Sequence, residues 1–436
     1  MARLFESLAA AEAARRRPPE ARALQPVGEL LARVGHPERR LRLIHIAGSK
    51  GKGSTALLCE AILGAAGLRV GTFTSPHLER WSERFRIAGR EVGEAGLVAA
   101  AERIRPHLAA LLRGTHPPGF FDVATAIAFV LFEQRGVDVA VIEVGIGGRL
   151  DATNVVQPAV SCVTSIELEH TERLGGTLAA IAREKAGVVK AGVPVVTGAL
   201  PAEAAEVVRA RATALGAPLR RLGHEFGVRV RRTSPEGLLL HLESGALAFE
   251  ARLPVLGQHL AGNAAMALAC VQQAGLVPPS CLAEAARRGL AVATLPGRTE
   301  ILGRRPWVVA DGAHTESSAS ALVRALDTLA CRERHMVLSI SAGKDPRRLL
   351  PILLAGASTL TVTRADPHRS ADPEAIAACA AGCSPGLPLR IIADPLAAVR
   401  RTLVELSADA LMCVTGSVYA AGAARAGLSR ALDSRR

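Results

Sequence analysis

The stretch from Ile44 to Thr55, which reads IHIAGSKGKGST, constrains the fold more than any other part of the chain. Residues 41–47 form a short apolar run typical of a buried strand, and residues 54–64 predict a helix that begins with two hydroxyl side chains. A strand, a glycine-rich turn and a helix start together predict a phosphate-binding loop, because glycines allow close backbone approach and the first helical N–H groups face an anion. A plain glycine turn is the alternative, and the flanking strand and helix favour phosphate binding.

The residue types of this loop suit a nucleotide with its metal ion. Lys52 would place a charge on the outer phosphates, and the hydroxyl of Ser54 or Thr55 would bind Mg²⁺. The spacing departs from the standard P-loop formula, because Gly53 separates the lysine from the serine. The predicted nucleotide-binding residues of the loop are Gly48, Ser49, Lys50, Gly51, Lys52, Gly53, Ser54 and Thr55.

Length and composition limit the class of protein. A chain of 436 residues is long enough for two or three domains, and 49% hydrophobic with 21% charged residues is typical of a globular protein. Net charge is +13, which fits acidic small substrates, a nucleic-acid partner, or simply solvated arginines; we favour the last. Only one Tyr, two Trp and nine Phe are available for base stacking, so a nucleic-acid partner is not expected.

The eight cysteines show no paired CxxC spacing, and most lie in apolar runs. They are expected to be small core residues in a reducing compartment rather than disulfides or zinc ligands. Neither a signal-peptide core nor an apolar stretch of about 18 residues is present, so we expect a cytoplasmic protein without a membrane partner. A monomer is expected.

Strand-like and helix-like segments alternate along the chain, which predicts an α/β fold with a parallel sheet covered on both faces. Residues 1–40, 96–113, 120–132, 177–190 and 257–276 have helical patterns, and strands are expected at 69–74, 138–145, 159–166 and 193–197. Short alternating stretches in 220–253 predict a small antiparallel β element. A hinge at 295–298 divides the chain into an ATP-binding domain, 1–294, and a smaller Rossmann-like α/β domain, 295–436.

A metal site is predicted where polar residues follow neighbouring strands. Glu143 ends a continuous apolar run, and a carboxylate there is costly unless it is paired or holds a metal. Ser75 and His170 also follow strands, and a carboxylate with hydroxyl and phosphate oxygens suits Mg²⁺. Hydrogen bonds from the glycine-rich backbone are the alternative for Glu143, and a structural role for His170. Lys185 reads as a surface lysine paired with a glutamate.

In the second unit, Asp311 and His314 follow a strand, which suits ribose or phosphate contacts as well as a capped turn. Arg298, in the hinge, is placed to reach the terminal phosphate across the cleft.

Taken in order, these motifs resemble the folylpolyglutamate synthase / dihydrofolate synthase family, a branch of the Mur ligases. The resemblance runs from about residue 33 to residue 425 and rests on the glycine loop and the segments 74–78, 143–154, 169–171, 183–187, 296–298, 311–314 and 414–419. It implies an ATP-dependent ligase in which a substrate carboxylate attacks the γ-phosphate and the amine of glutamate captures the acyl phosphate.

The resemblance also implies roles for individual residues. Ser75, Glu143 and His170 would hold Mg²⁺, with K⁺ as a further candidate ion, and Lys52, Lys185 and His170 would be catalytic. Lys185 matches the family's carbamylated lysine. Other implied contacts are to ATP from Asn263, Arg298, Asp311 and His314, and to the pterin from Phe121, Arg149 and Asp151. Dihydropteroate or a folate, L-glutamate and ATP would be the small-molecule partners.

Four positions depart from the family pattern. Lys50 stands in place of Asn, Glu169 in place of Asp, Thr315-Glu316 in place of Asn-Pro, and residues 260–262 in place of a polar lead-in to Asn263. The departures leave open a Mur-type ligase acting on a non-folate acid. The basic net charge leaves open a second alternative, a P-loop ATPase that binds nucleic acid.

Overall fold

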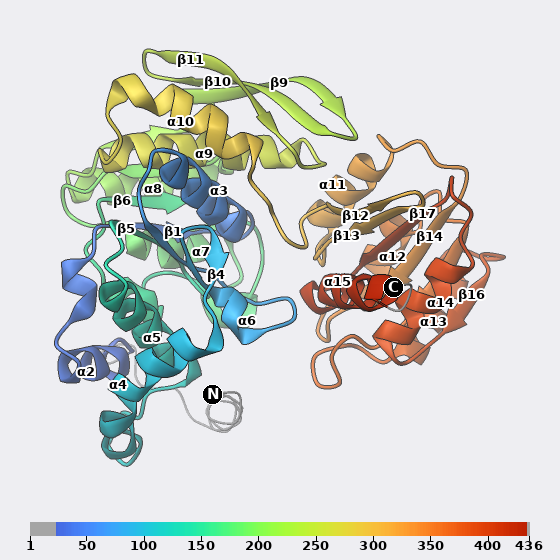
Figure 1. The fold of residues 1–436 in the computed structure, drawn as a ribbon, viewed down its shortest axis with the longest axis horizontal. Coiled ribbons are helices and arrows are strands. Elements are labelled where there is room, and N and C mark those ends of the chain that lie inside the picture. The colour runs from blue at the N-terminus through green and yellow to red at the C-terminus, as the bar shows by residue number, and fades with distance from the viewer. Residues whose placement is uncertain (1–22, 434–436) are drawn as a thin grey trace.

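The structure is a computed structural model that describes residues 23–433, with side chains described to residue 428, and it has two lobes (Figure 1). The N-terminal lobe is built on an eight-stranded sheet of order β4-β3-β2-β5-β1-β6-β7-β8. Its strands are β1 Leu43–Ala47, β2 Val70–Phe73, β3 Phe85–Ile87, β4 Arg90–Glu91, β5 Val139–Glu143, β6 Val160–Val163, β7 Val195–Thr197 and β8 Leu219–Arg221. Central β1 pairs in parallel with β5 and β6, so the loops that follow these strands meet at one edge.

Helices cover both faces of this sheet because its strands are apolar on both sides. Their bounds are α2 Gln25–Arg33, η2 Pro37–Arg40, α3 Lys52–Ala65, η3 Trp81–Arg84, α4 Glu94–Leu112, α5 Phe120–Gln134, η4 Ala152–Val155, α6 Thr171–Leu174, α7 Leu178–Lys185, η5 Ala186–Val188, α8 Ala202–Ala214, α9 His259–Ala274 and α10 Pro279–Ala291. One hydrophobic cluster joins α3, α9 and α10 to one face. Two others join α2, α4 and α5, and α7 and α8, to the opposite face.

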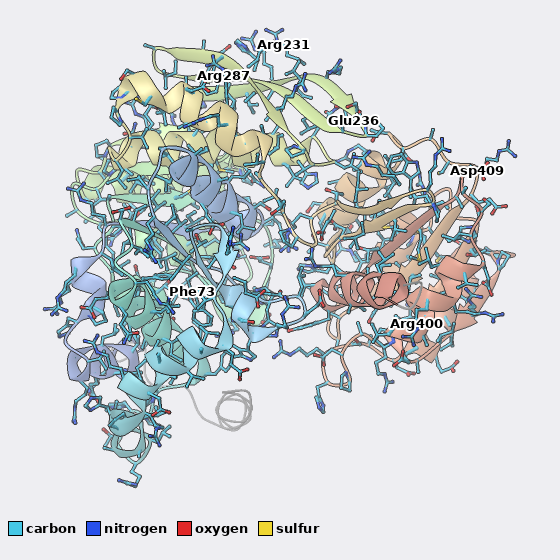
Figure 2. The ribbon with its side chains drawn as sticks, in the orientation of Figure 1. Phe73, Arg231, Glu236, Arg287, Arg400 and Asp409 are labelled. Carbon is cyan, nitrogen blue, oxygen red and sulfur yellow. The ribbon has the colours of Figure 1, made fainter. Side chains whose placement is uncertain are left out.

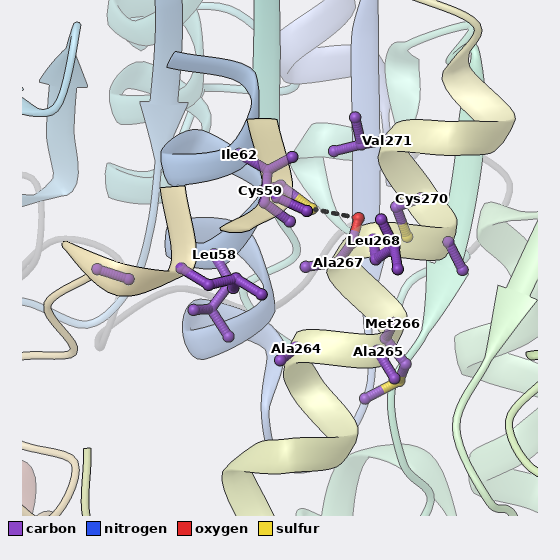
Figure 3. Close-up of a cluster of buried hydrophobic side chains, with 14 of the residues drawn as sticks. Leu58, Cys59, Ile62, Ala264, Ala265, Met266, Ala267, Leu268, Cys270 and Val271 are labelled. Atoms are coloured by element: carbon purple, nitrogen blue, oxygen red, sulfur yellow. Dashed lines mark hydrogen bonds between the residues drawn. The ribbon is translucent and has the colours of Figure 1, made fainter. Parts of the chain in front are cut away.

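The helix that follows the glycine loop packs directly on α9 (Figure 3). Leu58, Cys59 and Ile62 of α3 face residues 264–271 of α9, and Cys59 Sγ lies 3.7 Å from the carbonyl oxygen of Ala267. The small alanine side chains of α9 allow this close approach. The packing therefore fixes the start of α3, where the candidate phosphate site lies.

A three-stranded antiparallel sheet of order β11-β10-β9 packs beside α9 and α10, as the alternating pattern predicts (Figure 1). Its strands are β9 Phe226–Ser234, β10 Gly237–Ser244 and β11 Leu247–Leu253. Figure 2 shows charged side chains projecting outward over both lobes, and Arg231 and Arg287 are exposed near this sheet. Among residues 23–433, no helix combines the length and the apolar character needed to cross a membrane.

The C-terminal lobe contains a six-stranded sheet of order β12-β13-β17-β14-β15-β16. Its elements are β12 Glu300–Arg304, β13 Trp307–Ala310, α11 Glu316–Leu326, β14 Arg334–Leu338, α12 Pro346–Leu353, β15 Thr359–Val362, α13 Pro373–Cys383, β16 Leu389–Ile391, α14 Pro395–Val404, β17 Leu411–Thr415 and α15 Val418–Asp433. Helices α11, α12 and α13 cover one face, and α14 and α15 the other.

Several sequence-based expectations need correction. The first sheet is mixed rather than parallel, because β3 pairs antiparallel with β2 and with β4. In the second sheet β12 pairs antiparallel with β13. The helix expected over residues 1–40 is α2 followed by a 3₁₀ turn, and its predicted first half lies outside the described residues. Only half of the cysteines are buried, namely Cys59, Cys162, Cys270 and Cys413.

The two lobes touch through the turn that follows β2. Leu78, in this turn, packs against the hydrophobic cluster under α14 and α15 of the C-terminal lobe. A Cβ atom on Gly422 would lie 2.4 Å from the carbonyl oxygen of Leu78, and one on Gly297 would lie 3.0 Å from Leu78 Cδ2. The turn therefore fits closely into the second lobe, only three residues beyond Ser75.

Candidate active site

The glycine loop is tightly enclosed, and two of its glycines have backbone angles that favour glycine. Gly48 has φ +147°, and a Cβ atom there would lie 1.9 Å from Thr164 Oγ1. Gly51, the residue before α3, has φ +83°, and its Cβ atom would lie 2.6 Å from Asn263 Oδ1. The loop thus lies between the end of β6 and α9, and Asn263 adjoins it as the resemblance implies.

The two lysines of the loop have different partners. Lys52 Nζ folds back to the carbonyl oxygens of Gly48, at 2.9 Å, and Ser49, at 3.3 Å. Lys50 Nζ instead lies 3.2 Å from Glu169 Oε2 and 3.0 Å from His314 Nε2 of the C-terminal lobe. Only Lys52 therefore points its charge back into the loop.

Glu143 lies directly beneath the start of α3. Its Oε2 accepts a 2.8 Å hydrogen bond from the backbone N–H of Ser75, and a Cβ atom on Gly53 would lie 3.2 Å from the same oxygen. Burial raises the pKa of Glu143, while Lys52 and Arg298 act in the opposite direction. The structure thus brings Ser75, Glu143 and the loop together, and it places the charge of Arg298 close enough to affect them.

His170 begins α6 with φ +49°, and its side chain is 43% exposed. Its Nδ1 lies 3.8 Å from Glu172 Oε1, and burial lowers its pKa. Within residues 23–433, no group of three or more His, Cys, Asp or Glu side chains is arranged to hold a metal ion. His170 and Glu143 are therefore not part of a cluster of three or more such side chains.

Lys185 is not the surface lysine that its sequence context predicts. Its side chain is 1% exposed, and its Nζ lies 3.3 Å from Glu169 Oε1 rather than on the adjacent Glu184. Glu184 is instead paired with Arg149 at 2.7 Å. Burial, followed by the charge of Lys52, lowers the pKa of Lys185 to about 8.

Glu169 holds two lysines at once, because Lys50 and Lys185 contact different oxygens of its carboxylate. Burial alone would raise its pKa, but Lys52, Lys50 and Lys185 outweigh burial and hold the pKa at about 2. The crowding of glutamates after β6 is thus offset by cations from the loop and from α7.

Two of the three residues implied at the pterin site share one surface: Phe121 of α5, and Asp151 of the loop after β5. A Cβ atom on Gly145 would lie 2.7 Å from the Phe121 ring and 3.2 Å from Asp151 Oδ2. Asp151 accepts hydrogen bonds from the N–H groups of Ile146 and Thr153, each at 3.0 Å, and from Thr153 Oγ1 at 2.6 Å. Phe121 and Asp151 therefore border the same glycine, while the Arg149 side chain is engaged by Glu184.

In the C-terminal lobe, the carboxylate of Asp311 is used within its own turn. It accepts hydrogen bonds from the N–H groups of Thr299 and Ala313, both at 2.7 Å, and burial raises its pKa. The bond from Ala313 is the capped turn that the sequence left open. His314, three residues on, faces the glycine loop through Lys50.

Two charged residues of the site were missed from the sequence. Arg84 is buried, its guanidinium carbon lies 4.9 Å from the Trp81 ring centroid, and its charge favours ionised Glu143. Lys344, in the loop after β14, is close enough to lower the pKa values of His170 and His314. No sequence spacing connects either residue with the glycine loop, because the fold alone brings them near.

Comparison with known proteins identifies two family models that match this chain. Residues 122–271 match the Mur ligase middle domain, and residues 297–418 match the Mur ligase, glutamate ligase domain. The dihydrofolate synthase/folylpolyglutamate synthase of Mycobacterium tuberculosis is 35% identical over 438 aligned positions, which cover 92% of this chain and 89% of the relative. This chain belongs to the folylpolyglutamate synthase/dihydrofolate synthase family.

A solved structure supports the family membership at the level of the fold. The Mycobacterium tuberculosis folylpolyglutamate synthase complexed with ADP and AMPPCP matches with a TM-score of 0.86 and 34% identity, over 92% of this chain and 94% of that one. A probable bifunctional folylpolyglutamate synthase/dihydropteroate synthase of Haloferax volcanii is 36% identical over 94% of this chain. This chain spans only about half of that relative, 48% of its length.

Proposed function

We propose that this family member is an ATP-dependent ligase that joins L-glutamate to dihydropteroate, to a (tetrahydro)folate, or to both, through an acyl phosphate. The observation that carries the proposal is the position of Glu143 at the helix end of the glycine loop, 3.2 Å from where a Gly53 Cβ atom would lie. A buried carboxylate beside an anion-binding loop is unfavourable unless a cation lies between it and the phosphates.

Phosphate binding would use the backbone of the loop and the charge of Lys52. The loop ends at the start of α3, where unpaired N–H groups and the helix dipole favour an anion. Lys52 Nζ donates to two uncharged acceptors, the carbonyl oxygens of Gly48 and Ser49, so its charge is available to a phosphate at that position. Asn263, Arg298, Asp311 and His314 are the further nucleotide contacts that we propose.

The donor set around Glu143 suits Mg²⁺. It offers a carboxylate oxygen and the neighbouring Ser75, and Thr55 Oγ1 is buried with no hydrogen-bond partner among the described residues. Hard oxygen donors of this kind are the ligands that Mg²⁺ prefers, and bound Mg²⁺ would neutralise phosphate charge. We propose Ser75 and Glu143 as its ligands; His170 would join only if its exposed side chain turned inward. K⁺ remains a further candidate ion.

The reaction requires positioning more than covalent work by the protein. A carboxylate oxygen of the pterin substrate attacks the γ-phosphorus, and ADP leaves with the electrons of the broken P–O bond. The amine of glutamate then attacks the acyl carbon, and phosphate leaves. Lys52 and Arg298 would stabilise negative charge during both steps, and Phe121 with Asp151 would orient the pterin, with Arg149 at its border.

Lys185 is chemically suited to carbamylation. A lysine whose pKa is about 8 is partly neutral near neutral pH, and a neutral amine can attack CO₂ and release a proton. The resulting carbamate would add negative charge beside Glu169, where Lys50 already supplies a compensating cation. We propose this modification as the source of the catalytic role of Lys185.

The proposal is tested by incubating the purified protein with ATP, Mg²⁺, L-glutamate and either dihydropteroate or tetrahydrofolate. We expect glutamate-dependent ADP release and a glutamylated pterin, and we expect Lys52→Ala to abolish both. Arg332→Ala removes a distant surface cation, 85% exposed, and should leave turnover unchanged. The absence of a folate product would instead favour a ligase for a non-folate acid.

The nucleic-acid alternative makes a different prediction. Binding to random duplex DNA that falls steeply with salt and stimulates ATP hydrolysis would favour it over the ligase. We expect neither, because few aromatic side chains are available for base stacking, and exposed arginines occur on both lobes, as Arg231 and Arg400 do (Figure 2). We also propose that the protein is a monomer and that it acts in the cytoplasm.

A further inference from the structure

The ammonium group of Lys50 joins the two lobes at the glycine loop. Its Nζ lies 3.2 Å from Glu169 Oε2 in the N-terminal lobe and 3.0 Å from His314 Nε2 in the C-terminal lobe. The side chain is 25% exposed, and the Glu169 side chain is 7% exposed. A partly buried, charge-assisted contact of this kind is stronger than an ion pair on the open surface.

The tautomer of His314 makes it an acceptor for Lys50. His314 Nδ1 lies 2.8 Å from the carbonyl oxygen of Gly312, which can only accept, so Nδ1 carries the hydrogen. The other ring nitrogen, Nε2, then presents a lone pair to the Lys50 ammonium group. Burial, together with the Lys50 charge, holds the pKa of His314 at about 3, so the ring stays neutral.

The backbone of Lys50 is held by hydrogen bonds, and its second partner, Glu169, is held by another lysine. Its backbone N–H donates to Ser165 Oγ at 2.8 Å, and its carbonyl oxygen accepts from Thr164 Oγ1 at 2.6 Å. Glu169 is held in turn by Lys185 at 3.3 Å. The contacts therefore form a continuous chain from α7, through the glycine loop, to the loop after β13.

We propose that Lys50 is a positioning residue whose ammonium group ties the C-terminal lobe to the glycine loop through His314. The proposal rests on the proposed function, because the loop is taken to hold the phosphates to which the second lobe must be aligned. It divides the work of the two lysines: Lys52, turned into its own loop, serves the phosphates, and Lys50 sets the distance between the lobes.

Other contacts between the lobes provide controls. Ser317 Oγ donates to Glu167 Oε2 at 2.9 Å, but this contact is exposed, so its removal should matter little. Leu78 packs against a C-terminal hydrophobic cluster that does not include Lys50, so this contact should persist when Lys50 is changed. A Lys50 variant should therefore keep the lobes attached but let their relative position vary.

Energy transfer between the lobes tests the proposal directly. Cys281 on α10 and Cys383 on α13 are exposed and lie on different lobes, so they can carry a donor and an acceptor once Cys331 and Cys379 are replaced by serine. Without nucleotide, Lys50→Met should broaden the distribution of transfer efficiencies and shift its mean. Lys50→Arg should restore most of the wild-type distribution. Ser317→Ala should leave the distribution unchanged. His314→Ala should match Lys50→Met, and the double variant should be no worse than either.

Kinetic and binding measurements distinguish a Lys50 that contacts His314 from a Lys50 that binds phosphate. Lys50→Met should keep its affinity for AMPPCP within about threefold while kcat for glutamate-dependent ADP release falls roughly 10- to 100-fold, the range expected when reacting groups are misplaced by about 1 Å. Unchanged transfer in Lys50→Met overturns the proposal, and an affinity loss above about tenfold would make Lys50 a phosphate ligand instead. Failure of the proposed function would appear differently, as a wild-type protein that neither binds AMPPCP nor releases ADP.

Discussion

The backbone N–H of Ser75 donates a 2.8 Å hydrogen bond to Glu143 Oε2, which joins the ends of β2 and β5 beneath the glycine loop. The contact orients a carboxylate that burial disfavours in its charged form.

Glu143→Gln should remove the free-energy cost of burying a charged carboxylate, a cost that grows with pH. Because burial raises the folded-state pKa of Glu143, its contribution to stability is present at low pH and is lost as the pH rises through that folded-state value. The variant should therefore gain stability relative to wild type with rising pH, by about 1.4 kcal/mol for each unit of pKa shift. Thermal unfolding across pH measures this, with exposed Glu203→Gln as the control.

Magnesium should act on the same carboxylate. At neutral pH, Mg²⁺ should raise the Tm of the wild type and leave the Tm of Glu143→Gln nearly unchanged, since only the charged group attracts the ion. Removal of Mg²⁺ with a chelator should reverse the increase. Equal shifts in both proteins would contradict a metal site at Glu143.

Lys185 should make activity depend on dissolved CO₂. With a pKa of about 8, its neutral fraction rises between about pH 7 and pH 9, and carbamate formation should rise with it. Bicarbonate should therefore stimulate ADP release by the wild type, whereas Lys185→Ala should be inactive with or without it. Lys190→Ala, which changes a neighbouring half-buried lysine that contacts the Asn154 carbonyl oxygen, should keep the stimulation.

Gly51→Ala should weaken nucleotide binding through a clash and a backbone cost together. Its φ is +83°, and the new Cβ atom would lie 2.6 Å from Asn263 Oδ1. Gly67→Ala is the matched control, because Gly67 has φ +89° but nothing within 4 Å. The control should lose about 1–2 kcal/mol of stability without loss of AMPPCP affinity in calorimetry.

Leu58→Ala should test the packing of α3 on α9. Leu58 is fully buried in the cluster shown in Figure 3, so its truncation should cost about 2–5 kcal/mol in chemical denaturation. Val404 is 77% exposed on α14, and Val404→Ala should change stability by less than about 0.5 kcal/mol. Similar losses in both variants would contradict the burial of α3.

Continuous apolar runs made much of the fold predictable. The strand expected at residues 138–145 contains β5, and Glu143 does end a fully buried strand. β3 and β4 were missed because strands of three and two residues carry too little periodicity to be recognised. The mixed character of the first sheet follows from these short segments.

The site was less predictable, because its contacts join distant parts of the chain. The proximity of Asn263 to the loop agreed with the resemblance, but the burial of Lys185 opposed the local sequence, in which Glu184 is the obvious partner. The contact between Lys50 and His314 spans 264 positions, and no local pattern indicates it. Such pairs depend on how the lobes dock.

The close fit of Leu78 against Gly297 and Gly422 limits how this protein can be recombined with its relatives. The turn belongs to the N-terminal segment of the chain but fits the surface of the other lobe. A chimera joined at the hinge would therefore pack this turn against the C-terminal lobe of a different protein. A functional exchange of C-terminal lobes would therefore also require transfer of residues 75–80, so that this turn still matches the C-terminal lobe into which it packs.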